Sequence, residues 1–134
     1  MKLRKTLAGI LGAVVMLLGV GTFEHVNRET GVHAATETNS INFKDQGLTN
    51  GTVYTNFVIG HVNVTFASGG GTDPKYYTTG TGMRAYAKNT ITFDAGEYNI
   101  TKIVFTFGTG DGSNGITASV GSFSSPIWTG KTAL

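Results

Sequence analysis

The sequence predicts an all-β protein, an antiparallel β-sandwich of the jelly-roll type, preceded by a helical signal peptide. Three observations support this prediction. Apolar residues recur at every second position in several short segments, which is the period of a strand with one buried face. Residues 35–134 contain eighteen threonines and fifteen glycines, a composition that favours strands joined by tight turns. The same residues show no helical period over a useful length.

The first 34 residues have the organisation of a secretory signal peptide. They begin with the basic sequence MKLRK, followed at 6–21 by an apolar run interrupted by glycines. The compact residues VHA at 32–34 suit signal peptidase, so cleavage is predicted after Ala34, with Ala35 as the alternative. An uncleaved anchor is the competing interpretation, but the run is shorter than the roughly 20 residues that span a bilayer. The mature chain is therefore expected to be secreted, with the cell surface as the alternative location.

The leader also accounts for the excess positive charge. The whole chain has a formal net charge of +2, whereas residues 35–134 contain six basic and six acidic side chains. A neutral mature chain gives no electrostatic reason to bind DNA or RNA. The chain has no cysteine, which excludes disulfides and a lipoprotein anchor and is ordinary for proteins secreted by Gram-positive bacteria.

The mature part is predicted to be one domain of seven or eight short strands, at residues 40–134, after a flexible segment at 35–39. Alternating apolar residues and turn-forming residues between them predict the strands. These are expected within 40–43, 52–59, 62–66, 83–87, 90–94, 103–107 and 116–120, with a further one beginning at 127.

The stretch from Thr90 to Phe107 has the clearest pattern. Apolar residues alternate with polar ones in 90–94 and recur at every second position in 103–107, and six residues rich in turn formers, 94–99, separate the two runs. This arrangement predicts a β-hairpin with one apolar face. Such a face must pack on a second sheet, which is why a sandwich is expected.

Two segments carry a resemblance to a protein family. They are PKYYTTGTGMRAYAKNTITF at 74–93 and ITKIVFTFGTGDGSNGITASVGSFSSPIWTG at 100–130. The order of Lys-Tyr-Tyr, Arg-x-Tyr, Ile-x-Lys-Ile, Gly-Asp-Gly-Ser-Asn and Trp-Thr-Gly resembles that of an uncharacterised β-sandwich module of secreted and cell-surface bacterial proteins. The resemblance implies a non-catalytic appendage of larger surface proteins and hydrolases, with no catalytic residue to transfer.

The resemblance also has a consequence for the C-terminus. Members of that family continue for one or two strands beyond Trp-Thr-Gly, whereas four residues follow Gly130 here. The resemblance therefore implies a sandwich that lacks its closing strand or strands. The open sheet edge of such a sandwich would favour pairing with a strand of another chain.

Aromatic side chains and one arginine are the candidates for a ligand site. The apolar faces of sugar rings stack on aromatic rings, while arginine hydrogen-bonds the hydroxyl groups. The candidates are Tyr76, Tyr77, Arg84, Tyr86 and Trp128. Core packing is the competing interpretation for the aromatic residues, and an ion pair with Asp73 or Asp94 is the competing interpretation for Arg84. The sequence leaves both interpretations open.

A calcium site is a weaker candidate. Asp111 and Asn114 supply oxygen ligands in a glycine-rich turn, which suits calcium. The segment does not meet the EF-hand pattern, and a plain turn is the alternative. No other cofactor is predicted.

Catalysis has little support in the sequence. His61 is the only histidine of residues 35–134, and Asp94 and Glu97 are the nearest approach to a pair of hydrolytic carboxylates. We therefore expect a secreted, non-catalytic binding module for a polysaccharide or cell-wall glycan. The alternatives are a structural spacer, a truncated remnant of a larger surface protein or, least favoured, a small secreted hydrolase.

Overall fold

The computed structural model describes residues 4–8, 16–28, 36–80, 82–96, 98–109 and 111–130. Every strand pair in these residues is antiparallel. The helical segments described are two short 3₁₀ turns, η1 (Phe43–Gln46) and η2 (Asp111–Ser113). The prediction of an all-β, antiparallel protein is therefore confirmed. Within the described ranges, no helix is long and apolar enough to cross a membrane.

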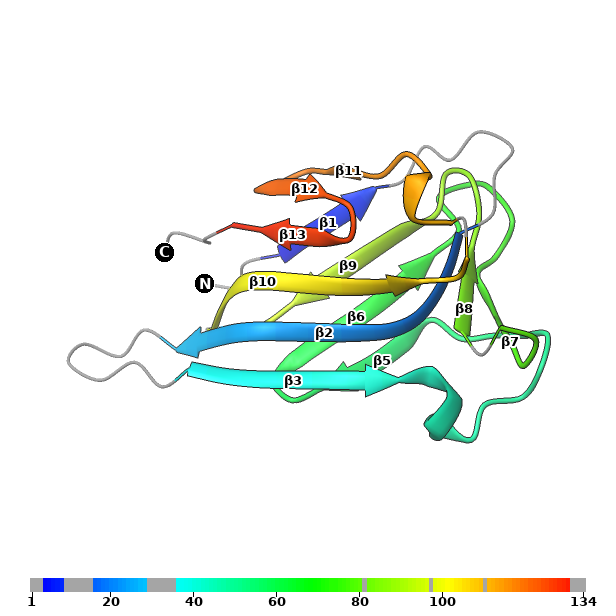
Figure 1. Ribbon diagram of the computed structural model, residues 1–134, viewed down its shortest axis with the longest axis horizontal. Coiled ribbons are helices and arrows are strands. Elements are labelled where there is room, and N and C mark those ends of the chain that lie inside the picture. The colour runs from blue at the N-terminus through cyan, green and yellow to red at the C-terminus, as the bar shows by residue number, and fades with distance from the viewer. Residues whose placement is uncertain are drawn as a thin grey trace.

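The strands form two sheets (Figure 1). The first sheet has the order β11 (Thr117–Ala118), β1 (Arg4–Ala8), β9 (Thr90–Asp94), β6 (Val62–Ala67), β5 (Asn56–Ile59). The second sheet has the order β12 (Ser122–Ser124), β13 (Ile127–Thr129), β10 (Tyr98–Phe107), β2 (Met16–Arg28), β8 (Gly82–Ala85), β7 (Lys75–Tyr77), β4 (Thr52–Val53). β3 (Thr36–Asn42) pairs with β2 outside this order.

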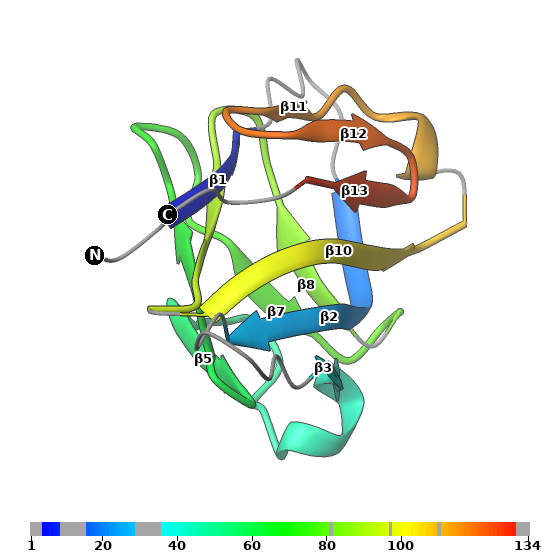
Figure 2. The same cartoon turned by 90° about the vertical axis from the view of Figure 1, so that its left-hand side faces the viewer.

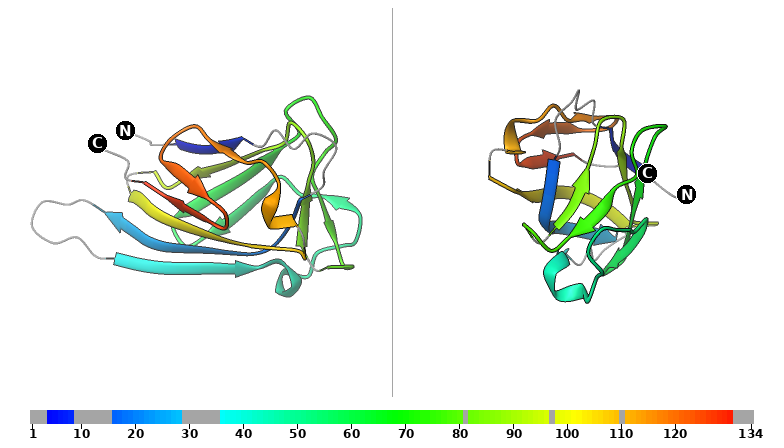
Figure 3. Two further views of the ribbon diagram at one scale, coloured as in Figure 1. Left: turned by 45° about the horizontal axis from the view of Figure 1, so that its top comes forward. Right: turned by 90° about the vertical axis from the view of Figure 1, so that its right-hand side faces the viewer.

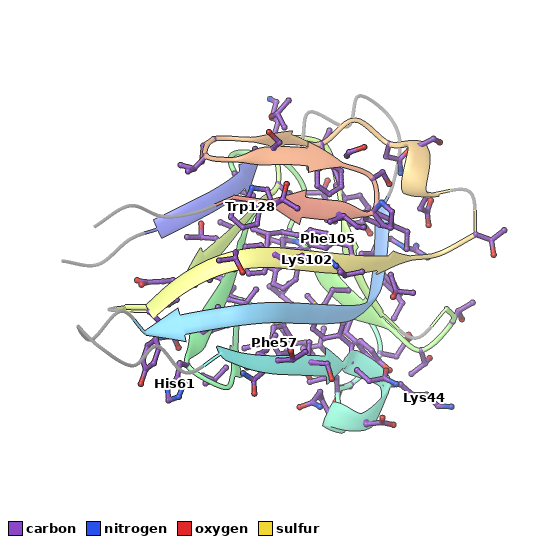
Figure 4. The ribbon with its side chains drawn as sticks, turned by 60° about the vertical axis from the view of Figure 1, so that its left-hand side comes forward. Lys44, Phe57, His61, Lys102, Phe105 and Trp128 are labelled. Carbon is purple, nitrogen blue, oxygen red and sulfur yellow. The ribbon has the colours of Figure 1, made fainter. Side chains whose placement is uncertain are left out.

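Buried apolar side chains of both sheets meet in one core (Figure 4). The ring of Phe93 on β9 lies 6.0 Å from that of Phe105 on β10, and the ring of Phe43 lies 5.0 Å from that of Phe57 on β5. Burial alternates along β6 and β9, as the sequence pattern predicts. The two sheets therefore face each other across the core (Figure 2).

Both strands at 90–94 and 103–107 are present, but the prediction that they pair as a hairpin is wrong. β9 pairs with β1 and β6 in the first sheet, whereas β10 pairs with β13 and β2 in the second. The chain crosses from one sheet to the other in a turn where the amide of Tyr98 donates to the carbonyl oxygen of Ala95 at 3.0 Å. The apolar faces of the two strands consequently meet across the core, as the contact between Phe93 and Phe105 shows.

Two strands come from the segment predicted to be a leader. Residues 4–8 form β1, between β9 and β11, and residues 16–28 form β2, which pairs with β10, β3 and β8. These two described parts of the segment are therefore extended, where the signal-peptide prediction expected a helix. Residues 9–15 and 29–35, including the predicted cleavage position, lie outside the described residues.

The C-terminal strand β13 lies inside the second sheet. It pairs with β10 on one side and with β12 on the other. β12 occupies part of 121–126, which the sequence pattern predicts to be a loop. Among the described strands, β12 is therefore the outermost one on this side of the second sheet, and the missing closing strand stays a prediction.

Candidate functional site

The candidate site is built on the antiparallel pair β7 and β8, at the end of the molecule away from both chain termini (Figure 3). Residues that face each other across such a pair project to the same side of the sheet. Tyr76 is opposite Met83, and these side chains are 3% and 0% exposed. Lys75 is opposite Arg84, and both are partly exposed. The inner face of this pair therefore belongs to the core, and the side chains of the outer face are partly exposed.

The outer face brings together Tyr77, Arg84 and Tyr86, which we call the Tyr–Arg–Tyr cluster. The guanidinium carbon of Arg84 lies 4.3 Å from the centre of the Tyr77 ring, a cation–π arrangement. The hydroxyl groups of Tyr77 and Tyr86 are hydrogen-bonded at 3.3 Å. All three side chains are partly exposed. Three of the five predicted ligand residues thus form one contiguous group.

Asn89 positions Tyr86, and it is not among the residues predicted from the sequence. Its side-chain oxygen accepts a hydrogen bond from the backbone amide of Tyr86 at 2.8 Å. Its side-chain nitrogen donates to the carbonyl oxygens of Ser68 and Thr72 at 3.0 and 2.7 Å. Asn89 is 3% exposed, so these bonds compensate its burial and attach the glycine-containing loop at 68–72 to the turn at 86–89. Its only sequence signal is an asparagine after Lys88 in a predicted turn.

The electrostatics of the cluster follow from this packing. Burial is the largest cause that raises the pKa of the Tyr86 hydroxyl, followed by its hydrogen bond with Tyr77, while Arg84 acts in the opposite direction. The Nε atom of Arg84 is buried and has no hydrogen-bond partner among the described residues. Arg84 therefore has hydrogen-bonding capacity that its described neighbours do not use.

Lys75 and Arg84 place two positive charges opposite each other on the same face. Like charges in this position destabilise a strand pair. Within the part of the chain that the structure describes, no ion pair joins either of them to a carboxylate. Asp94, one predicted partner of Arg84, is on β9 of the first sheet, and its carboxylate accepts from the amide of Gly96 at 2.9 Å.

Two of the five predicted ligand residues, Tyr76 and Trp128, are buried in the structure. Tyr76 is buried opposite Met83, as described above. Trp128 is 1% exposed, and its indole nitrogen donates to the carbonyl oxygen of Val120 at 2.7 Å. An added Cβ at Gly121 or Gly130 would lie 2.6 or 2.5 Å from the indole ring, so the backbone closes tightly around it. Both side chains belong to the core and cannot stack on a sugar in this structure.

The predicted calcium ligands lie at the turn η2. The backbone amide of Asn114 donates to the carbonyl oxygen of Asp111 at 3.1 Å, which closes a tight turn. In the ranges that the structure describes, no group of three His, Cys, Asp or Glu side chains lies together. The plain-turn interpretation accounts for the geometry, and calcium binding at Asp111 and Asn114 stays a prediction.

Two further surface features lie away from the Tyr–Arg–Tyr cluster. The outer face of the first sheet has an open depression of about 240 Å³ lined by Asn63, Thr65, Thr92 and Asp94. The ring of His61 is stacked on that of Tyr98, with centres 4.2 Å apart. Among the side chains that the structure describes there, neither feature combines an aromatic surface with a cation on one face, which is what the predicted glycan chemistry needs.

No protein-family model, curated protein or solved structure matches this chain. A functional proposal therefore rests on the site alone.

Proposed function

We propose that the protein is a secreted, non-catalytic module that binds a glycan through Tyr77, Arg84 and Tyr86. The observation that carries the proposal is the cation–π contact of Arg84 with Tyr77 on a partly exposed face. An aromatic ring offers an apolar surface to the C–H face of a sugar, and a guanidinium group beside it supplies donors to the oxygen atoms. Because the ring and the guanidinium group are already in contact, little ordering is needed before binding.

The two cations of this face favour an anionic glycan. Lys75 and Arg84 are opposite each other in the strand pair, so an anion bound between them would be attracted to both charges. A guanidinium group matches the two oxygen atoms of a carboxylate or phosphate. The proposed ligand is therefore an acidic polysaccharide or a phosphate-bearing cell-wall polymer.

The architecture and location belong to the same proposal. Two antiparallel sheets that face each other across one core support a β-sandwich of the jelly-roll type. The basic and apolar N-terminal residues support export and an extracellular or cell-surface location. An exported module with an exposed binding face would attach to polymers at the cell surface.

A purely structural role is the second candidate, and one observation favours it. The hydroxyl groups of Tyr77 and Tyr86 bond to each other, and Arg84 covers the Tyr77 ring. These contacts hold β7, β8 and the following turn together without any ligand. In that case the cluster would stabilise the domain, and the domain would act as a spacer.

Affinity electrophoresis of the 134-residue chain distinguishes the two candidates. We expect native gels containing polygalacturonate to retard the protein, and gels containing its methyl ester or dextran to retard it less. Arg84→Ala should weaken the interaction about tenfold, the value of one charge-assisted contact. Arg84→Lys keeps the charge but loses the planar guanidinium group, so its affinity should lie between those of the unmodified chain and Arg84→Ala.

Two control variants keep the comparison interpretable. Lys44→Ala removes an exposed cation of η1 and changes the net charge by the same amount as Arg84→Ala. Tyr98→Ala removes a partly exposed aromatic ring elsewhere. Both should bind like the unmodified chain. Equal retardation of Arg84→Ala and Lys44→Ala, with circular dichroism showing both folded, would leave the structural role as the account of the cluster.

A further inference from the structure

The strand β2 holds the second sheet together. It pairs with β10 from Leu18 to Arg28 on one side. On its other side it pairs with β8 from Met16 to Leu18 and with β3 from Val20 to Asn27. In Figure 1, β2 runs between β10 and β3 along most of its length. It is therefore an interior strand with backbone partners on both sides.

Without β2 the second sheet would be divided. β12, β13 and β10 would form one part, and β8, β7 and β4 would form another, because β2 is the link between β10 and β8. β3 has β2 as its strand partner and would be left beside the gap. In the first sheet, loss of β1 would separate β11 from β9.

The sequence predicts that the residues forming β1 and β2 are removed after export. Both strands lie before Ala34, whereas β3 and all later strands lie after it. In the second sheet, cleavage there would leave a gap one strand wide, bordered by β10 on one side and by β3 and β8 on the other. Backbone amide and carbonyl groups along these borders would lose their partners, and unsatisfied backbone groups in a protein interior are costly.

We propose that this gap is a strand-acceptor site, which takes an extended apolar peptide segment of a partner protein once the leader has been cleaved. Residues 16–28 occupy the site in the uncleaved chain. This inference rests on the export proposed above and is independent of glycan binding. Addition of a strand from another chain to exposed strand edges is an established mode of peptide recognition, in which backbone hydrogen bonds supply affinity and alternate side chains supply specificity.

The registers define the chemistry of the segment that fits. Gly21 stands opposite Phe105 on β10 and opposite Ile41 on β3. Those two side chains are 5% and 6% exposed, so this position has large apolar neighbours on both sides. Ile103, which is 1% exposed, is opposite position 23. A partner strand therefore needs a small residue at the first position, an apolar one two residues later, and no proline where the backbone is paired.

A chain that can be cut after folding tests this site. A specific protease sequence is inserted between Ala34 and Ala35, and the 134-residue chain is purified folded and then cut. A fluorescent peptide with the sequence of residues 16–28, MLLGVGTFEHVNR, is added in excess. The control peptide carries Gly21→Pro and Phe23→Pro, because each proline lacks an amide hydrogen and clashes with strand pairing. Size-exclusion chromatography reports which peptides co-elute with residues 35–134.

We expect the labelled peptide to displace the leader fragment and co-elute with the cut chain. The proline peptide should bind at least about tenfold more weakly, and the uncut chain should bind neither. If the cut chain unfolds when the leader leaves, recovery of its β-sheet circular dichroism on adding the peptide also supports the site. The proposal is overturned if residues 35–134 keep the same melting temperature without the leader and bind no peptide, or if they unfold and the peptide restores nothing. Because the cut is made in vitro and no glycan is present, neither result depends on export or on polysaccharide affinity.

Discussion

Tyr76 and Tyr77 are neighbours in the chain, yet they belong to different regions of the molecule. Tyr76 is 3% exposed and packs in the core, together with Trp128. Tyr77 lies on the outer face of the same strand, where Arg84 covers its ring. The two regions use the same kinds of side chain for different purposes. The buried pair contributes to stability, whereas the Tyr–Arg–Tyr cluster is the site that we propose for a ligand.

The difference arises from the pleat of the strand and from its neighbours. Successive side chains of a strand point to opposite faces, and pairing of β7 with β8 fixes which face is buried, because Met83 is opposite Tyr76. Mutations that remove a ring should therefore have large effects on stability in the core and small ones on the outer face.

Trp128→Ala should cause the largest loss of stability. The side chain is 1% exposed, and truncation of a buried aromatic side chain costs about 3–5 kcal/mol through lost burial and the cavity left behind. Chemical denaturation of the 134-residue chain measures the loss. Trp128→Phe should still destabilise the protein, because it loses the hydrogen bond to Val120. It should cost less than Trp128→Ala, because it keeps an aromatic ring in the core. A loss below about 1 kcal/mol for the alanine variant would contradict the assignment of Trp128 to the core.

Gly121→Ala tests how closely the backbone surrounds that indole. The φ angle of Gly121 is +73°, and an added Cβ would lie 2.6 Å both from the carbonyl oxygen of Thr129 and from the Trp128 ring. We expect a loss of about 2–4 kcal/mol, from the backbone conformation and overpacking together. Gly70→Ala is the matched control, since its φ is +85° and no atom lies within 4 Å of the added Cβ. It should cost only about 1–2 kcal/mol. Equal losses for the two variants would show that the close contacts with the indole and with the Thr129 carbonyl oxygen have no effect.

Tyr77→Ala should have a much smaller effect on stability than Trp128→Ala. The ring is partly exposed, and its contact with Arg84 contributes about 0.5–1 kcal/mol at such a site. Thermal unfolding followed by circular dichroism gives this comparison. A loss as large as that of Trp128→Ala would show that the outer cluster is a structural element, which is the spacer interpretation.

The pH dependence of stability gives the smallest expected effect. The pKa of the Tyr86 hydroxyl is raised in the folded state, chiefly by burial. The stabilisation that this raised pKa contributes is therefore complete below the unfolded pKa of about 10. It decreases as the pH rises from there through the folded pKa, because the unfolded chain releases the proton first. Denaturation at a series of pH values should show a decline above pH 10 that Tyr86→Phe reduces. An identical decline in both proteins would contradict the burial of this hydroxyl.

The strands after residue 40 can be predicted from the sequence because one face of each is buried. β6 and β9 alternate with period two, and their inward residues are the predicted ones. The connection of β9 to β10 could not be predicted, because a turn such as 94–99 can either pair two strands or pass them to opposite sheets. The strand β2 was missed because its apolar, glycine-containing sequence equally suits a leader.

The candidate site could be predicted only in part. Periodicity places Arg84 and Tyr86 on one face, which is the arrangement observed in the cluster. It gives no information on whether Tyr76 or Tyr77 is the outer residue of Lys-Tyr-Tyr, because that depends on the register with β8. Asn89 could not be predicted, since its partners Ser68 and Thr72 come from a distant loop.

Chemical-shift mapping of the ¹⁵N-labelled 134-residue chain, titrated with a galacturonate oligosaccharide, tests the proposed function most directly. The account predicts shifts concentrated at Lys75, Tyr77, Arg84 and Tyr86, with saturation, and none for the uncharged methyl ester at the same concentration. Shifts confined to the depression formed by Asn63, Thr65 and Thr92 on the first sheet, or no shifts at millimolar ligand, would contradict it.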